Sequence, residues 1–300
     1  MAVSPSILAS AGADIPILPH RRDRRCRGGP PGPYNRVMPF APVKESQLYY
    51  EVYGPAPGTA PAIVFAHGAG GNHLSWWQQV PRFAERYTCV VFDHRGYGRS
   101  ADAPGGPGGA AYVEDLRALL DHLGIERATL VAQSMGGWTC LGFALAHPRR
   151  VDRLLMCDTH GGLASEEIDA RWREALRAPR GAVADGVHPA AGARMYREQP
   201  ELYFLYAEID RLNPERTRAE IMAILRAAGS PPLAAVAELA MPVLFIGGEE
   251  DVVIPPEVLD LAAAAIPEAR VERVPETGHS VYFERPAAFN AILDRFLATG

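Results

Sequence analysis

Lysine is almost absent from this 300-residue chain, and Lys44 is the only one. Lys44 precedes the first predicted strand, so no lysine is available in the central part of the chain to serve as a base or to form a Schiff base. Lys and Arg together number 30 against 35 Asp and Glu, which gives a formal net charge of -5. This balance gives no electrostatic reason to expect nucleic acid or an anionic membrane as a partner.

Cysteine is also scarce, with four in the chain: Cys26, Cys89, Cys140 and Cys157. Their spacing matches neither a zinc site nor a disulfide framework, and the last three fall in apolar stretches. We therefore expect reduced, buried thiols. We expect no metal and no cofactor.

Long apolar runs are missing, so no segment is predicted to span a bilayer. The basic cluster at 21–27 follows the mildly apolar segment 6–18, which is the wrong order for a secretory signal. These features predict a cytoplasmic protein. Residues 1–36 are rich in Arg, Gly and Pro without sustained periodicity, and we expect a disordered tail there.

Strand and helix patterns alternate along the chain that follows. Strand patterns occur at 47–54, which partly alternates, and at 62–66, 88–92, 128–131, 153–157, 242–246 and 269–274. Helical patterns occur at 75–86, 112–123 and 135–147, between the early strands. Short connections and right-handed crossovers then give a mostly parallel, doubly wound sheet. Ligands of such sheets bind at the carboxyl ends of the strands.

The alternation stops between residues 161 and 240. This stretch has helical patterns near 166–177, 203–212 and 216–228 and no convincing strand. We expect an α/β core formed by 37–160 and 241–300, with 161–240 as a helical cap over the strand ends.

The sharpest feature is the turn at residues 130–138, which read Leu-Val-Ala-Gln-Ser-Met-Gly-Gly-Trp. A buried strand leads into a helix that begins near Met135, and Ser134 stands at the corner. Such a turn requires small residues two positions before and after the serine, here Ala132 and Gly136. The helix N-terminus directs backbone N–H groups toward a developing oxyanion.

This turn resembles the nucleophile elbow of the α/β-hydrolase superfamily, Gly-x-Ser-x-Gly, with Ala132 in place of the first glycine. The resemblance implies an α/β-hydrolase fold and a triad in the order serine, acid, histidine. Residues 248–255 resemble the family pattern Gly-x-x-Asp-x-x-x-Pro, which selects Asp251 as the acid. Glu249, Glu250 and, one strand earlier, Asp158 remain alternative acids.

The resemblance also assigns the base and the oxyanion donors. His279 follows the last predicted strand, where the family places its catalytic histidine. The backbone amides of Ala69 and Met135 are the expected oxyanion hole. We expect His67 and residues 93–100 to be structural, whereas His73 and His160 are candidates for the pocket border. His188 is interpreted as solvent-facing or as a loop cap.

A triad of this kind cleaves a small-molecule ester through an acyl-enzyme. The sequence favours a carboxylesterase for short to medium acyl chains, with a lactonase, a carbon–carbon bond hydrolase and a non-catalytic small-molecule receptor as alternatives. For the substrate pocket we predict Trp76, Trp77, Tyr203 and Tyr206, although aromatic residues at such spacings also serve as ordinary packing residues.

Overall fold

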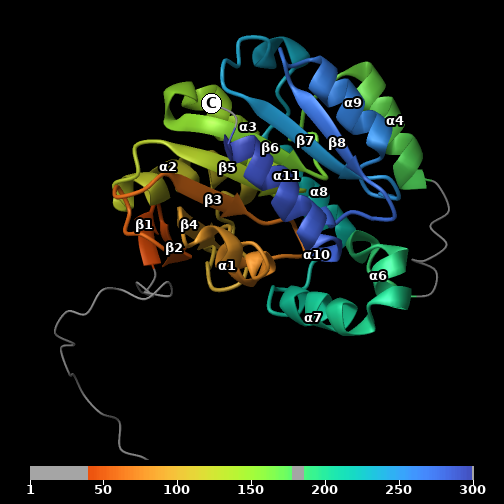
Figure 1. Ribbon diagram of the computed structural model, residues 1–300, viewed down its shortest axis with the longest axis horizontal. Helices are drawn as coiled ribbons and strands as arrows, with labels where there is room; N and C mark the ends of the chain where they lie inside the picture. Colours follow the sequence, from red (N-terminus) through yellow and green to blue (C-terminus); the bar gives the residue numbers. More distant parts are fainter. Residues whose placement is uncertain (1–39, 178–185, 299–300) are drawn as a thin grey trace, which may run out of the picture. The chain divides into compact units, whose positions relative to one another are not determined.

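The computed structural model describes residues 40–177 and 186–298. The predicted tail at 1–36 and Cys26 lie outside these residues. The described chain contains an eight-stranded sheet in the order β1-β2-β4-β3-β5-β6-β7-β8 (Figure 1). The strands are β1 (Phe40–Val43), β2 (Ser46–Tyr53), β3 (Ala62–Ala66), β4 (Thr88–Phe92), β5 (Ala128–Gln133), β6 (Val151–Cys157), β7 (Val243–Gly248) and β8 (Arg270–Val274).

The pairing confirms the predicted mostly parallel sheet. The strands from β4 to β8 in the sheet order pair in parallel, whereas β1 and β2 form an antiparallel hairpin and β2 pairs antiparallel with β4. Strand β1 is an element that the sequence patterns did not reveal. Its four residues are too few to show a periodicity.

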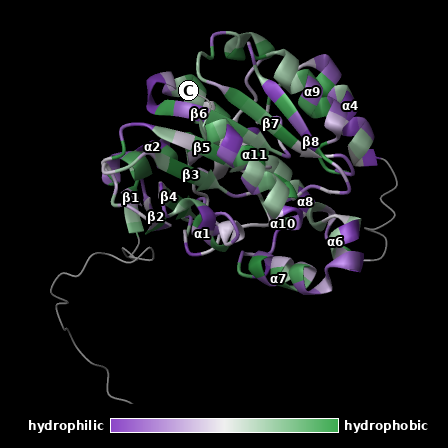
Figure 2. Cartoon of the chain, in the orientation of Figure 1, coloured by the Kyte–Doolittle hydropathy of each residue, from purple (hydrophilic) through white to green (hydrophobic). Residues whose placement is uncertain are grey.

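Both faces of the central strands are covered. In β3, Val64 and Ala66 belong to one apolar cluster, with α2 (Tyr112–His122), α3 (Gly136–Ala146) and α9 (Pro256–Ala264). Ile63 and Phe65 belong to the other, with α1 (Val80–Phe83), α10 (Val281–Glu284) and α11 (Pro286–Ala298). Burial on both faces explains why the central strands β3, β4, β5 and β7 read as continuous apolar runs. Figure 2 shows these strands as hydrophobic, in contrast to the partly hydrophilic edge strand β8.

The helix predicted over 75–86 is two short segments. A 3₁₀ segment, η1 (His73–Trp76), begins with a capping box in which Asn72 and Ser75 cap each other's backbone amides. Helix α1 then begins with Pro81 in its first turn. Proline has no amide to continue a preceding helix, so the break falls there.

The segment between β6 and β7 is helical where it is described. It contains α4 (Glu166–Arg177), α6 (Ala193–Glu198), α7 (Pro200–Asp210) and α8 (Arg218–Ala228), with 3₁₀ segments η4 (Pro189–Ala191) and η5 (Leu233–Val236). In Figure 1, α6 and α7 lie together on the side of α10. Thr217 and Glu220 form a capping box at the start of α8. The domain limits at 160/161 and 240/241 stay a prediction.

The remaining 3₁₀ segments are η2 (Gly108–Ala111) and η3 (Pro148–Arg150). Cys89, Cys140 and Cys157 are free and buried. Among the described helices, none has the length and apolar character needed to cross a membrane.

A buried ion pair joins the loop after β4 to helix α2. The guanidinium of Arg95 donates from Nε to Asp115 Oδ2 at 2.8 Å and from Nη2 to Asp115 Oδ1 at 2.6 Å. Nη2 also donates to the carbonyl of Lys44 in the β1–β2 turn, at 2.9 Å. The Arg95 side chain is fully buried and that of Asp115 is 4% exposed. One guanidinium thus connects three separate parts of the core.

Replacing Asp115 by Ala removes the forked carboxylate partner of the buried Arg95 and leaves it only the longer carboxylate contact from Nη1 to Asp102 Oδ1 at 3.4 Å. We expect the free energy of unfolding to fall by roughly 3–5 kcal/mol, as for other broken buried pairs. Glu114→Ala is the matched control on the same helix, because Glu114 pairs with Arg117 at the surface and its loss costs less than about 1 kcal/mol. Urea denaturation measures both. Equal small losses would contradict a structural role for the Arg95–Asp115 pair.

Candidate active site

Ser134 lies at a strained corner between β5 and α3. Its φ is +46°, a left-handed conformation that serine seldom adopts. The corner is tight because α3 begins directly against β3: a Cβ atom added to Gly136 would lie 2.3 Å from the carbonyl oxygen of Ala66. The small residue predicted two positions after Ser134 is therefore required by the backbone itself.

Three side chains far apart in the sequence form one hydrogen-bonded chain. His279 Nδ1 lies 2.7 Å from Asp251 Oδ2, and His279 Nε2 lies 2.9 Å from Ser134 Oγ. Because a carboxylate only accepts, Nδ1 carries the proton and Nε2 is left to accept from the serine hydroxyl. His279 and Asp251 are 2% and 5% exposed. The structure thus brings together the serine, acid and histidine that the sequence singled out.

The loop after β7 fixes the orientation of the Asp251 carboxylate. Its Oδ1 accepts from the amides of Val253 at 2.7 Å and Ile254 at 2.9 Å, so Oδ2 remains for His279. The backbone of His279 is held in turn, because Gln133 Nε2, next to the serine, donates to the His279 carbonyl at 2.9 Å. The imidazole therefore has little freedom to leave the serine.

The alternative acids lie elsewhere. Asp158 is fully buried, and its carboxylate accepts from the amides of Gly248 at 3.1 Å and Val281 at 3.0 Å. It joins the loops after β6, β7 and β8 instead of contacting the imidazole. Glu250 forms a surface ion pair with Arg194, and Glu249 is exposed. Asp251 is thus the carboxylate that orients His279, and the alternative assignment of Asp158, Glu249 or Glu250 as the acid is wrong.

Charges around His279 favour its protonated form. Burial by itself lowers the pKa of His279, but the charge and hydrogen bond of Asp251, with the carboxylates of Asp158 and Glu284, raise it above its ordinary value. The buried Asp158 is affected in the same surroundings: desolvation and the charge of Asp251 raise the pKa of Asp158 to about 7. An imidazolium that forms beside Ser134 is therefore stabilised.

Two backbone amides beside Ser134 are free to donate. Ala69, after β3, and Met135, at the start of α3, both border the cavity around the serine. Within the described chain neither amide has an acceptor. An N–H group left without an acceptor costs free energy unless a ligand or water satisfies it. These are the two amides that sequence reasoning named for the oxyanion hole.

The residues interpreted as structural take part in a hydrogen-bond network behind the serine. His67 Nδ1 donates to the Gly68 carbonyl at 2.7 Å, and its Nε2 accepts from the amide of His94 at 2.9 Å. Burial lowers the pKa of His67 to about 4 and keeps the ring neutral. Asp93 accepts from His73 Nδ1 at 2.8 Å and from the Arg99 amide at 2.8 Å.

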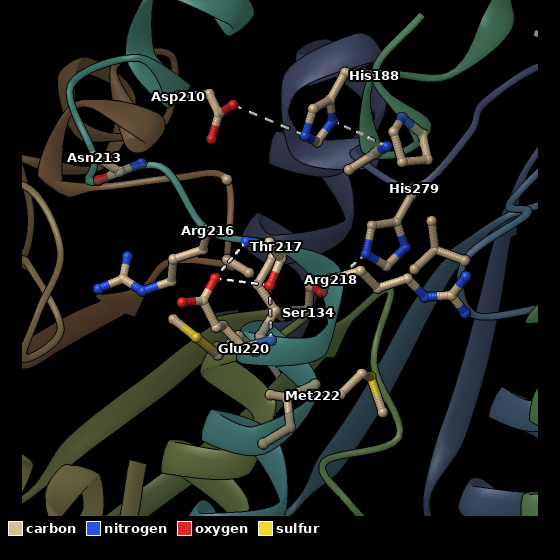
Figure 3. A pocket seen from close by; sticks show the side chains of 18 of the residues that line it. Ser134, His188, Asp210, Asn213, Arg216, Thr217, Arg218, Glu220, Met222 and His279 are labelled. Atoms are coloured by element: carbon tan, nitrogen blue, oxygen red, sulfur yellow. Dashed lines mark hydrogen bonds and ion pairs between the residues drawn. The ribbon is translucent and has the colours of Figure 1, made fainter. Parts of the chain in front are cut away.

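The serine opens into a pocket of about 760 Å³ (Figure 3). One part of its lining is apolar, with Trp138, Trp172, Ile221, Met222, Leu225 and Val253. The other part is polar, with His188, Asp210, Asn213 and Arg216. Both parts include residues of the helical segment 161–240. Neither in the pocket nor anywhere else in the described residues are three or more His, Cys, Asp or Glu side chains arranged to hold a metal ion.

Only Tyr206 of the four aromatic residues predicted for the pocket lines it. Trp76 is fully buried and packs against Phe65 and Tyr282 in the core, with ring centroids 5.1 and 4.5 Å away. Trp77 is 43% exposed beside Phe283. The prediction that Trp76, Trp77 and Tyr203 line the pocket is therefore wrong. The two tryptophan rings pack against other aromatic side chains, and the Tyr203 hydroxyl accepts from the His188 amide at 3.3 Å.

The two histidines considered for the pocket border lie outside this lining. His73 borders a separate surface cavity of about 450 Å³ with Glu51 and Arg99. His160 is buried between Trp138 and Trp172, whose rings lie 4.9 and 4.7 Å from it. Neither histidine therefore lines the pocket around Ser134.

Comparison with known proteins identifies the family. Residues 61–286 match the family model described as "alpha/beta hydrolase fold". The chain belongs to the α/β-hydrolase family. It is 30% identical to "Putative carbamate hydrolase RutD" of Caulobacter sp. (strain K31), over 84% of this chain and 96% of that protein.

Two solved α/β-hydrolase structures show similar folds. An enol-lactonase from Burkholderia xenovorans LB400 is 28% identical with a TM-score of 0.70, over 87% of this chain and 100% of that one. A thermophilic esterase from Thermogutta terrifontis is 26% identical with a TM-score of 0.69, over 88% of this chain and 98% of that one. The fold and the hydrolase family are therefore established.

Sequence reasoning missed the polar side of this α/β-hydrolase pocket. His188 is a cap, as interpreted, because its Nδ1 accepts from the Ala190 amide at 3.2 Å, but it also lines the pocket. Its Nε2 then carries the proton and faces Asp210 Oδ2 at 3.9 Å. Asn213 and Arg216 follow between α7 and α8. A loop of polar residues between two helices carries no periodic signal, so no sequence pattern pointed to them.

The electrostatics of His279 can be measured directly. We expect its imidazole to titrate above its ordinary pKa of 6.5 in the wild type, and Asp251→Asn to lower that pKa because the largest raising influence is removed. Nuclear magnetic resonance of the imidazole protons across pH 5–9 gives both values, and Glu250→Gln, at the surface, serves as the control. An unchanged titration in Asp251→Asn would contradict the assigned pairing.

Proposed function

We propose that this α/β-hydrolase is a serine carboxylesterase in which Ser134 is the nucleophile, His279 the base and Asp251 the orienting acid. The observation that carries the proposal is the hydrogen-bonded chain from Asp251 through His279 to Ser134 at the wall of a pocket large enough for a small molecule. The pocket volume and its mixed lining suit an ester with a short to medium acyl chain.

The reaction begins when Ser134 Oγ attacks the ester carbonyl carbon while its proton passes to His279 Nε2. Asp251 holds the proton on Nδ1 and stabilises the imidazolium. As the tetrahedral intermediate collapses, Nε2 returns the proton to the leaving alcohol, and the acyl group remains on Ser134. A water then attacks the acyl-enzyme while its proton passes to His279 Nε2. As the second tetrahedral intermediate collapses, Nε2 gives that proton to Ser134 Oγ, and the carboxylic acid is released.

The negative charge of the tetrahedral intermediate requires two donors at the carbonyl oxygen. The unpaired amides of Ala69 and Met135 are the proposed donors, and the positive end of α3 adds to their field. Because both are backbone groups of the loops that hold Ser134, they are in place before substrate arrives. One such donor typically contributes about 3 kcal/mol to the barrier reduction.

We further propose that the helical segment 161–240 acts as a cap that selects the substrate. Helices α7 and α8 and their connection supply much of the lining of the pocket that contains Ser134. The core then provides the chemistry and the cap provides the shape of the pocket, so that changes in the cap alter specificity without altering the triad.

A lactonase is the second candidate. A lactone is a cyclic ester, so the same attack and collapse would open it, and the similarity to the enol-lactonase structure favours this substrate class. The carbon–carbon bond hydrolase is a further alternative. Comparing open-chain p-nitrophenyl esters with acyl-homoserine lactones in one assay decides between the two ester classes.

Ser134→Ala is the direct test of the esterase. It removes the nucleophile and leaves the fold intact, so we expect p-nitrophenyl butyrate hydrolysis to fall by roughly 10³-fold or more at an unchanged melting temperature. A fluorophosphonate should label the wild type at Ser134 and leave the variant unlabelled, as mass spectrometry of the peptide shows.

Equal inactivity of the wild type and the variant, with retained binding of a small-molecule ligand, would favour the receptor alternative instead. Undiminished hydrolysis in Ser134→Ala would refute the proposed nucleophile.

A further inference from the structure

Arg216 is a half-buried cation of the pocket. Hydrogen bonds from Thr217 lower the pKa of Glu220, and the charge of Arg216 lowers it further, but no carboxylate of the described residues lies within ion-pair distance of Arg216. Three carboxylates line the same pocket but are placed otherwise. Glu220 accepts from the Thr217 amide and hydroxyl, both at 2.7 Å, Asp210 faces His188, and Glu215 is exposed. The guanidinium of Arg216 is therefore available to pair with a negatively charged ligand in the pocket.

The Arg216 side chain is nevertheless held in place. Its Nη2 donates to the Gly96 carbonyl and its Nη1 to the Pro214 carbonyl, while the guanidinium carbon lies 4.3 Å from the centroid of the Tyr97 ring. A guanidinium has five N–H donors, so these two contacts leave several without a protein acceptor. Stacking on Tyr97 and two backbone contacts thus fix the guanidinium while several of its N–H donors remain available to bind a carboxylate.

Asn213 provides a second unused donor on the same loop. Its Oδ1 accepts from the Gly98 amide at 3.0 Å, and within the described chain its Nδ2 forms no hydrogen bond of good geometry although the residue is only 9% exposed. The nearest carboxylate is that of Asp210: burial raises the pKa of Asp210, whereas His188 and the Asn213 side-chain amide act to lower it. A buried amide nitrogen without an acceptor costs about 1–3 kcal/mol unless a ligand or water accepts from it. Figure 3 shows Asn213 and Arg216 on the same side of the pocket, across from His279.

We propose that Arg216 and Asn213 form a carboxylate-binding subsite, so that the substrate is an ester or lactone that itself carries a carboxylate. The inference rests on the proposed esterase function and specifies its substrate class. A guanidinium binds a planar carboxylate through two parallel N–H donors, and an adjacent amide N–H adds a third. The apolar lining around Trp138 and Met222 would then receive the rest of the substrate.

Matched esters test the subsite. Mono-4-nitrophenyl glutarate is compared with 4-nitrophenyl valerate for a carboxylate on the acyl side, and 4-carboxyphenyl valerate with phenyl valerate for one on the alcohol side. In at least one pair we expect the wild type to prefer the carboxylate member. Arg216→Gln should lower that ratio of kcat/KM about tenfold or more, as expected for a lost charge-assisted contact, while kcat/KM for the neutral ester changes less than about threefold.

Two further variants separate the subsite from general effects. Arg216→Lys keeps the charge but loses the forked geometry, so its ratio should lie between those of the wild type and Arg216→Gln. Arg226→Gln removes an exposed arginine of α8 that does not line the pocket, and its ratio should stay within about twofold of the wild type. The neutral ester reports on folding in every variant.

The proposal is overturned if Arg216→Gln leaves both ratios unchanged, or lowers neutral and carboxylate esters equally. Should the wild type hydrolyse none of the four esters, the esterase proposal fails, and the subsite is tested separately by calorimetric titration with glutarate. Binding to the wild type that weakens about tenfold in Arg216→Gln supports the subsite, whereas no binding or equal binding overturns it.

Discussion

The site depends on how closely the start of α3 approaches β3. At Gly136 the helix backbone leaves no room for a Cβ atom against the Ala66 carbonyl, and Ser134 accepts a left-handed φ to make the turn. The same close approach places the free Met135 amide beside the loop that carries the Ala69 amide. Strain at Ser134 is thereby tied to the position of the proposed nucleophile and of the two proposed oxyanion donors, and the packing of the buried sheet stabilises the strained turn.

The loops after β6, β7 and β8 depend on a second constraint, the burial of two carboxylates next to one imidazole. Asp251 uses one oxygen to fix its own loop and the other to hold His279, whereas Asp158 uses both oxygens on the amides of Gly248 and Val281. The two carboxylates have different roles because the donors around them differ: Asp251 faces the imidazole N–H of His279, whereas Asp158 faces two backbone amides. Asp158 does not contact the imidazole ring. It links the loops that carry Asp251 and His279 through its hydrogen bonds to the Gly248 and Val281 amides.

The core was predictable because its signals are local and strong. Strands buried on both faces read as apolar runs, and the serine and the acid follow such runs, whereas the histidine follows the partly hydrophilic edge strand β8. The carboxyl ends of these parallel strands meet at one edge of the sheet. The missed elements β1, α6 and α10 have between four and six residues each, too few for a periodicity. The error at Trp76 has another origin: an aromatic ring at helical spacing suits a pocket or a core equally, and only the contacts with Phe65 and Tyr282 decide.

The polar side of the pocket could not be predicted from the sequence, because its residues are placed at the pocket by contacts with a loop that is distant in the sequence. Asn213 is held by Gly98 and Arg216 by Gly96, more than a hundred positions earlier in the chain. The capping box at Thr217 fixes where α8 starts, and so how far Arg216 reaches. The connection between α7 and α8 is thus anchored to the loop after β4 at two points. Under the proposed function, a substitution there is expected to change what the pocket binds. The hydrogen-bonded chain at Ser134 is carried by the loops after other strands, so it is expected to stay unchanged.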